Sequence, residues 1–415
     1  MRKREKKEKL GPLDMWLLGT VLVLVGVGVL LVFDASYRKT VDAKWADYDT
    51  WFFAKRQLAF AAVGIIAALI VSRMRLTTFL KFTLPLLTAS MLLLAAVLVF
   101  GVQKNGAYRW FQFGQISFQP SELAKIGLVL YLAAVLAQRK RLVRRPSSRW
   151  LVPLGIVGLS SLLILIEPDL GTTLALVGTC FLMFFAAGAM KRYLLAFAVG
   201  GAGLVWLAIV IEPYRMERIR TWLDPWRDPY GEGYQIIHSL IAHGTGGWLG
   251  VGLCEGREKA YLPAASTDFV FSTLAEEAGL IGGIALLAAF GFLVYRGLDI
   301  ARRSRSTYAN LLAVGVTSAI GLQALINIAV ASAAIPATGV PLPLISYGGS
   351  SLVFTLTLVG ILLAVSRQVH VYLEDRELYE NSYHGWRDRR TYLPGNQRRS
   401  GTSRSRTGRR TTVHW

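Results

Sequence analysis

The residue best placed for chemistry is a carboxylate at the boundary between a long polar segment and an apolar run. Asp268 ends the segment Tyr261-Leu-Pro-Ala-Ala-Ser-Thr-Asp268, and the apolar run after it is long enough to cross a membrane. A carboxylate at that boundary can take a proton from a substrate hydroxyl as a general base. It can equally cap the helix that follows by accepting hydrogen bonds from free backbone amides. The residues alone leave both interpretations open.

Charged side chains upstream form a second group of candidates. Pro120 suits the first turn of a helix, so Glu122 and Lys125 should lie three residues apart on one helical face. Charges that enter a membrane are costly unless they pair or face water. We expect either an ion pair between Glu122 and Lys125, or a site in which Lys125 and Arg109 present cations to an anionic head group.

Further polar candidates lie at or near helix ends. Asp169 lies in a short turn, where its default role is to cap the next helix and the alternative is a catalytic or metal-binding role. Glu276 lies two to three turns inside the apolar run after the boundary carboxylate, and buried carboxylates at membrane depth usually mark function. Ser346 lies in a turn rich in Pro and Gly (335–351), which must be covered by protein or line an aqueous cavity.

The polar segment 212–269 carries the remaining signals. Arg218 and two neighbouring arginines alternate with apolar residues at helical spacing, which predicts an amphipathic helix in the membrane interface. His238 and His243 are five residues apart and would not share a helical face, so we do not expect them to ligate a metal. The glycine-rich run 244–252 lacks the lysine of a phosphate-binding loop and indicates close backbone packing.

The composition places these residues in a membrane protein. Of the 415 residues 53% are hydrophobic and 17% charged, with a mean hydropathy of +0.43, which is too apolar for a single soluble core. A spanning helix needs about 20 mainly apolar residues. Ten segments qualify, namely 14–33, 57–72, 79–100, 121–138, 150–166, 170–190, 194–211, 270–295, 309–334 and 350–366. The sequence therefore predicts an all-α polytopic membrane protein of about ten transmembrane helices, with a large extracytoplasmic loop between helices 7 and 8.

The distribution of Lys and Arg predicts the orientation, because positive residues near helix ends are retained in the cytoplasm. The basic head (1–13), the loop 139–145 and the Arg-rich tail (367–415) fall on one side if ten helices are counted. Both termini should then be cytoplasmic, and the tail, which lacks apolar runs, should be disordered. The formal charge of +20 lies in these segments, which favours anionic membrane lipids as partners rather than nucleic acid.

Six motifs follow one another along about residues 12–368. They are Arg109-Trp110 with Gln-Pro-Ser-Glu-Leu-Ala-Lys125, Glu-Pro-Asp-Leu-Gly-Thr-Thr173, Asp-Pro-Tyr-Gly-Glu-Gly-Tyr-Gln235, Tyr-Leu-Pro-Ala-Ala-Ser-Thr-Asp268, Ala-Glu-Glu-Ala-Gly279 and Pro-Leu-Pro-Leu-Ile-Ser-Tyr-Gly-Gly-Ser-Ser351. Together they resemble the SEDS proteins, the family of FtsW, RodA and SpoVE.

The resemblance implies a peptidoglycan glycosyltransferase of the bacterial cytoplasmic membrane that polymerises lipid II, with a class B penicillin-binding protein and divisome or elongasome proteins as partners. It also implies that Asp268 is the family's essential acidic residue. The family usually has Pro-Glu-Ala-His-Thr-Asp where this chain has Pro263-Ala-Ala-Ser-Thr-Asp268, so any help from the Glu and His is lost. Trp222-Leu-Asp-Pro-Trp226 and Ala275-Glu-Glu277 look more like the division branch and so favour the septum, whereas Gly339-Val-Pro-Leu-Pro343 resembles RodA. On balance the resemblance favours the FtsW-like branch.

The roles expected in such a transferase follow from its chemistry. A sugar diphosphate already has a good leaving group, so one base is sufficient, and Asp268 would act by direct displacement with inversion. The departing diphosphate needs cations. The candidates for binding the substrate are Arg109, Lys125, Glu122, Arg218, Asp169, Ser346 and Glu276. No dedicated metal site is expected, although a divalent cation such as Mg2+ could share the charge.

Two other functions fit the same residues. A flippase for lipid II would also need intramembrane charges, but its site should lie near the bilayer midplane and open to both sides. Here the charges gather at the outer edge of the predicted helices. A scaffold for the transpeptidase, without catalysis, would tolerate every change at Asp268.

Overall fold

The computed structural model describes residues 11–41, 48–104, 107–114, 116–138, 151–304 and 306–368. The basic head (1–10), the loop 139–150 and the tail from residue 369 onward lie outside the described residues. The predictions of cytoplasmic basic segments and of a disordered tail therefore stay predictions.

Each of the ten predicted apolar segments forms a helix. The helices are α1 (Met15–Val41), α2 (Phe52–Ser72), α3 (Leu76–Phe100), α4 (Pro120–Gln138), α6 (Leu151–Ile166), α7 (Leu170–Ala186), α8 (Lys191–Ile211), α11 (Val270–Arg303), α12 (Thr307–Ala331) and α13 (Gly349–Arg367). Within the described ranges, eight of them are long and apolar enough to cross a membrane, and α6 and α7 are apolar but shorter. The predicted all-α polytopic fold is confirmed.

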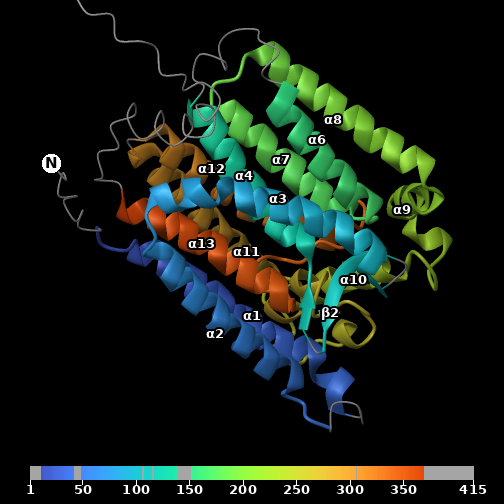
Figure 1. Cartoon of the computed structure of the whole chain (residues 1–415). Coiled ribbons are helices and arrows are strands. Elements are labelled where there is room, and N and C mark those ends of the chain that lie inside the picture. The colour runs from blue at the N-terminus through green and yellow to red at the C-terminus, as the bar shows by residue number, and fades with distance from the viewer. Residues whose placement is uncertain are drawn as a thin grey trace, which may run out of the picture. The chain divides into compact units, whose positions relative to one another are not determined.

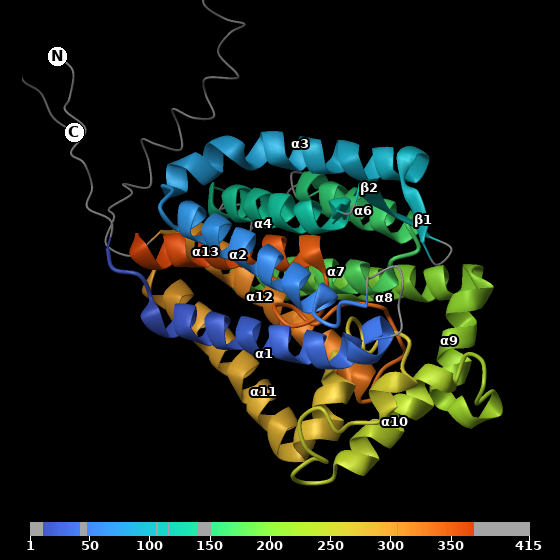
Figure 2. The ribbon, with the colours of Figure 1, turned by 90° about the horizontal axis from the view of Figure 1, so that it is seen from below.

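The helices alternate in direction, so the connections gather at two ends of the bundle (Figures 1 and 2). At one end, which we call the terminal end, the amide of Gly11 donates to the carbonyl of Arg367 at 2.9 Å, and that arginine's Nε donates back at 3.0 Å. The amide of Leu76 after the α2–α3 turn donates to the side chain of Gln368 at 3.0 Å. The described start and finish of the chain thus lie beside each other, as expected if the chain crosses the membrane an even number of times.

The opposite end, which we call the loop end, carries the polar segments. It contains the strands β1 (Val102–Lys104), β2 (Ala107–Phe113) and β3 (Ile116–Phe118), the turn between α6 and α7, and the helices α9 (Pro213–Leu223) and α10 (Tyr234–Gly246). The large loop predicted between helices 7 and 8 is folded, because α9 and α10 lie within it (Figure 1).

Helix α12 is the centre of the bundle. It packs against α4, α7, α11 and α13, and most of its residues are buried. Helix α8, by contrast, is almost entirely exposed and lies at the edge (Figure 1). An apolar helix that no protein covers must face lipid in a membrane, so α8 is a peripheral span and α12 is an internal one.

Three local features differ from the prediction. Helix α1 continues through Val41, eight residues beyond its predicted end at residue 33, and includes Asp34. The segment 102–118, expected to be a loop, forms a small antiparallel sheet in the order β1-β2-β3. Helix α11 is broken at Gly279, where φ is +64° and ψ is −164°.

Candidate functional site

The Asp268 carboxylate is partly buried at the loop end, immediately before α11. It does not cap that helix, because α11 begins at Val270 and no side-chain cap bond is present at its start. The backbone carbonyl of Asp268 accepts a hydrogen bond of 2.8 Å from the Asn327 amide on α12, which fixes its position. Its carboxylate has no hydrogen bond among the described residues, so the capping alternative is not supported.

Charged neighbours surround the Asp268 carboxyl. Burial and the negative charge of Asp169 raise its pKa from 3.8 to about 6, while Arg218 and Arg109 act in the opposite direction. Asp169, Arg218 and Arg109 are all predicted site residues, and the fold brings them within electrostatic reach of the boundary carboxylate. A carboxyl with a pKa near 6 is a stronger base than an ordinary aspartate and is still mostly ionised at neutral pH.

The two arginines are held by backbone carbonyls rather than by carboxylates. Arg109 on β2 donates from Nε to the carbonyl of Glu167 at 2.7 Å and from a second nitrogen to the carbonyl of Pro168. Arg218 on α9 is exposed and donates to the carbonyl of Ala337 at 3.0 Å. Because no carboxylate neutralises either guanidinium in these contacts, both keep a full charge for an anionic ligand.

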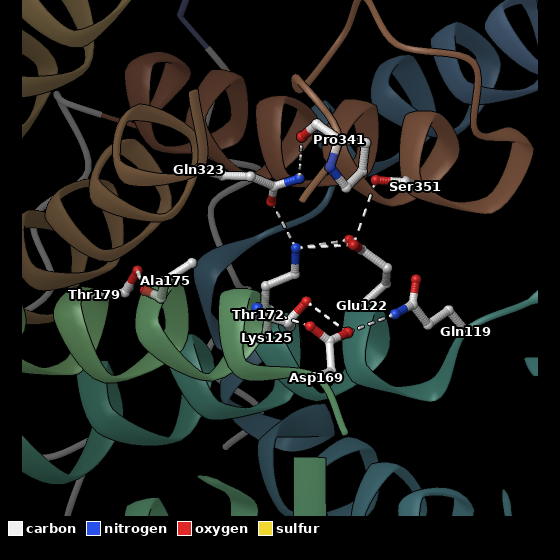
Figure 3. Close-up of polar contacts among 10 residues, drawn as sticks. All are labelled: Gln119, Glu122, Lys125, Asp169, Thr172, Ala175, Thr179, Gln323, Pro341 and Ser351. Atoms are coloured by element: carbon white, nitrogen blue, oxygen red, sulfur yellow. Dashed lines mark hydrogen bonds and ion pairs between the residues drawn. The ribbon is translucent and has the colours of Figure 1, made fainter. Parts of the chain in front are cut away.

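Asp169 caps α7, as its position in the sequence predicts. Its carboxylate accepts from the amide of Thr172 at 3.0 Å and from the hydroxyl of the same residue at 2.9 Å, and the Gln119 amide donates to it at 3.2 Å (Figure 3). Three donors use its oxygens, so Asp169 acts on the site through its charge.

Glu122 and Lys125 form the ion pair that their spacing allows. The Lys125 ammonium lies 2.9 Å from the Glu122 carboxylate, donates to the Gln323 amide oxygen at 2.7 Å, and is buried (Figure 3). The Ser351 hydroxyl donates to the same carboxylate at 3.3 Å. Lys125 is therefore a paired internal cation, in contrast to Arg109 and Arg218.

Ser346 fastens the Pro- and Gly-rich turn to the segment before Asp268. Its hydroxyl donates to the carbonyl of Thr267 at 2.5 Å and accepts from the amide of Leu342 at 2.8 Å. The Asn327 amide also donates to the carbonyl of Val340 at 2.7 Å. Val340 and Leu342 are buried, which confirms that protein covers this non-helical turn.

Glu276, on α11, binds the backbone of the large loop. Its carboxylate is buried and accepts from the amides of Arg257 at 2.7 Å and Glu258 at 3.1 Å. The neighbouring Glu277 lies 2.6 Å from the ammonium of Lys259, which also pairs with Asp34. These contacts join α11 and α1 to the large loop and do not reach Asp268.

The glycine-rich run 244–252 packs against the break in α11. The amides of Val251 and Gly252 donate to the carbonyls of Glu276 and Glu277 at 3.0 and 3.1 Å, which the break leaves without helical partners. The amide of Leu280 donates back to the carbonyl of Gly247 at 2.9 Å. Close backbone packing, predicted from the sequence, is confirmed.

An apolar hollow of about 260 Å³ opens beside the charged group. Leu170 and Leu174 of α7, Val205 and Ile209 of α8, and Ile219 of α9 line it, with Arg218 at its margin. The hollow therefore offers hydrocarbon contacts next to an exposed guanidinium, which suits a ligand with an anionic group on an apolar chain.

The side chains do not form a metal cage. Among the described residues no three His, Cys, Asp or Glu side chains are grouped closely enough to hold an ion. The Asp169 carboxylate, whose charge acts on Asp268, already accepts hydrogen bonds from three donors. His238 contacts Glu258 at 2.5 Å and His243 contacts the carbonyl of Ser239 at 2.7 Å.

Sequence reasoning missed several residues of the site. Gln323 and Asn327 lie one helical turn apart on the central helix, and their amides contact Lys125 and Asp268 respectively. Two amides at that spacing in an apolar helix were a usable signal, because polar groups inside a membrane helix need partners. Glu167 is fully buried, and burial together with the charge of Asp169 raises its pKa to about 9.

Comparison with known proteins identifies relatives along most of the chain. The FtsW/RodA/SpoVE family profile, described as cell cycle protein, matches residues 15–371. Stage V sporulation protein E of Bacillus subtilis (strain 168) is 42% identical over 361 residues, which cover 85% of this chain and 97% of that protein. A probable peptidoglycan glycosyltransferase FtsW from Saccharophagus degradans is 38% identical over 365 residues, covering 86% and 93%.

Solved structures agree with the sequence relatives. One solved structure comes from a study of how a peptidoglycan synthase complex coordinates polymerization and crosslinking. One of its chains has a TM-score of 0.71 and 34% identity, and the match covers 87% of this chain and 99% of that one. The rod shape determining protein RodA of Thermus thermophilus has a TM-score of 0.64 and 29% identity, covering 87% and 98%. The chain therefore belongs to the FtsW/RodA/SpoVE family of cell cycle proteins, the SEDS family.

Proposed function

We propose that this chain is a peptidoglycan glycosyltransferase that polymerises lipid II at the outer face of the cytoplasmic membrane. Relatives that carry the name peptidoglycan glycosyltransferase support the reaction class. The observation that carries the proposal is the geometry around Asp268, a partly buried carboxylate that has no hydrogen bond to any described residue and lies within electrostatic reach of two arginines.

In the proposed reaction, the Asp268 carboxylate takes the proton of the attacking sugar hydroxyl. The hydroxyl oxygen forms a bond to the anomeric carbon of the second substrate as the bond from that carbon to the diphosphate oxygen breaks. The leaving lipid diphosphate carries away the electron pair, and Arg218 and Arg109 meet its negative charge. Direct displacement inverts the anomeric configuration.

The other candidates take supporting roles. The Glu122–Lys125 pair and Asp169 set the local field, and Ser346 holds the turn that faces Asp268. The apolar hollow beside Arg218 receives the first part of the lipid chain. No step in this account requires a metal ion.

A class B penicillin-binding protein is the proposed partner. A structural relative with 34% identity belongs to a peptidoglycan synthase complex that couples polymerization to crosslinking. Such a partner would crosslink the strands that this chain makes, at the septum or along the side wall.

Purified protein in detergent, supplied with lipid II, tests the proposal. The wild type should make glycan strands, and Asp268→Asn should make none while retaining its thermal unfolding temperature or exceeding it. Asp49→Asn is the matched control, because among the described residues the Asp49 carboxylate contacts only the exposed Lys55 at 2.8 Å and the amide of Trp51 at 2.9 Å. A flippase would yield no strands in detergent from either protein, and a scaffold would bind its partner without making them.

A further inference from the structure

A second hollow adjoins the apolar one, and Arg218 and Ala337 line both of them. It has a volume of about 220 Å³ and is lined mainly by polar atoms, including those of Thr221, Glu232 and Gln235. Its lining residues come from α9, the turn before α10, the start of α10, and Ala337, all at the loop end. None of the roles assigned above uses it.

The turn that forms one wall is fixed by its own hydrogen bonds. The Asp228 carboxylate accepts from the amides of Gly231 and Glu232 at 3.1 and 3.2 Å, and the Asp228 carbonyl accepts from the amide of Gly233 at 3.1 Å. This turn contains the motif Asp-Pro-Tyr-Gly-Glu-Gly-Tyr-Gln235.

Two side chains of that motif remain available to a ligand. Glu232 is exposed and Gln235 is half-buried, and within the described ranges neither side chain has a hydrogen bond or an ion pair. A carboxylate and an amide together supply both acceptors and donors, which is the combination that sugar hydroxyl groups need. The buried residue Thr221, on α9, adds a third polar side chain to the lining.

Arg218 is common to the two hollows. It lines both of them, and its side chain donates to the carbonyl of Ala337, which also lines both. A ligand that extends through the two hollows would place hydrocarbon in one, polar groups in the other, and an anion at the guanidinium that they share. A lipid-linked sugar diphosphate has its three parts in that order.

We propose that the polar hollow bounded by Arg218, Thr221, Glu232 and Gln235 is a saccharide subsite, which holds the sugar head of the substrate whose diphosphate lies against Arg218. This inference rests on the proposed function and adds to it the residues that recognise the sugar. Glu232 and Gln235 bind the ground state and the transition state alike, because they lie away from the bond that changes.

Steady-state polymerisation by the purified full-length protein tests the subsite. Glu232→Gln combined with Gln235→Ala should raise KM for lipid II about tenfold and leave kcat nearly unchanged, since uniform binding is lost. Glu232 is exposed, Gln235 is half-buried and neither side chain is paired with a described residue, so the double variant should fold. Glu217→Gln is the matched control: Glu217 lies on α9, outside the hollow, and makes only a long 3.4 Å contact with Arg220.

A second readout separates the sugar from the lipid diphosphate. Undecaprenyl diphosphate, which lacks the sugar, should inhibit the double variant and the wild type equally, whereas a soluble disaccharide peptide should inhibit the variant less. If the wild type polymerises and KM is unchanged in the double variant, the subsite is wrong and the proposed function stands. If the wild type makes no strands, the proposed function fails, and saturation-transfer NMR with the disaccharide peptide decides the subsite alone.

Discussion

At the scale of single residues, the site combines polar side chains that are hydrogen-bonded to the protein with polar side chains that have no hydrogen bond to a described residue. Asp169 and Lys125 have their polar atoms occupied by protein partners, whereas Asp268 has none for its carboxylate. Free polar groups in a partly buried position are costly for folding, and they persist where a ligand completes them.

The raised pKa of Asp268 predicts the pH dependence of the reaction. Only the ionised carboxylate can accept a proton, and its pKa of about 6 lies above the ordinary value of 3.8. The rate should therefore be constant above neutral pH and fall about tenfold per pH unit below pH 6. Initial rates of polymerisation from pH 4.5 to 8.5 measure this, with substrate titration checked by binding at each pH. A rate that is flat from pH 5 to 7 would exclude Asp268 as the base.

The raised pKa of Glu167 predicts that the free energy of unfolding depends on pH. Its pKa of about 9 in the folded protein lies above the ordinary 4.5, so the folded state holds the proton more tightly and stability falls as pH rises between these values. Glu167→Gln cannot ionise, and its advantage over the wild type should grow by about 4 kcal/mol between pH 5 and pH 8. Thermal unfolding in detergent at both pH values measures it. Glu217→Gln, at an exposed site, should show no such trend.

The local roles of residues could be predicted from the sequence, but the contacts between residues that are distant in the chain could not. Capping by Asp169 and the pairing of Glu122 with Lys125 depend on spacings of three residues, which helical geometry fixes. Asp268 was open to two interpretations, because its freedom depends on where α11 begins. The approach of Arg218 to Asp268 depends on how the large loop folds, and no local pattern encodes that.

At the scale of elements, the break in α11 links the large loop to the membrane bundle. Residues 270–278 form a buried stretch after Asp268, and the longer part from residue 280 runs to the terminal end. The run 247–252 supplies hydrogen bonds to the carbonyls that the break exposes. This packing fixes the direction in which α11 leaves Asp268.

Glycine is required at the break in α11. We therefore expect alanine to destabilise the protein at this position but not at another glycine of the same helix. A Cβ at Gly279 would lie 2.4 Å from the amide nitrogen of Gly250, in a backbone conformation open essentially to glycine alone. Gly279→Ala should lower stability by about 1–3 kcal/mol and reduce polymerisation. Gly291→Ala is the control, because Gly291 lies in the same helix facing open space and the change should stabilise by about 0.5–1 kcal/mol. Equal unfolding temperatures for the two variants would contradict this account.

Elements differed in how well the sequence predicted them, for physical reasons. The spanning helices were predicted because each is a long apolar run, which lipid requires. The sheet β1–β3 was missed because its strands are three to seven residues long and are stabilised by pairing with each other. The extra turns of α1 were missed because Asp34 looked like a loop residue, and its partner Lys259 lies 225 positions away.

At the scale of the whole molecule, the two ends of the bundle have different chemistry. The loop end carries Asp268, Arg109, Arg218 and the apolar and polar hollows, whereas the terminal end carries the described start and finish of the chain. A substrate with its sugar outside the cytoplasm can reach Asp268 only if the loop end faces outward. The proposed reaction therefore requires one orientation of the entire bundle.

Cysteine labelling tests that orientation. The native Cys180 is buried, so replacing the exposed Cys254 with Ser leaves no reactive thiol among the described residues. In that background Tyr230→Cys, at a loop-end position that is 92% exposed, should react with a membrane-impermeant maleimide in intact cells. Arg73→Cys, in the exposed turn at the terminal end, should react only after the cells are permeabilised. The reverse pattern would place Asp268 on the cytoplasmic side, where it could not polymerise lipid II at the outer face, and the proposed function would fail with it.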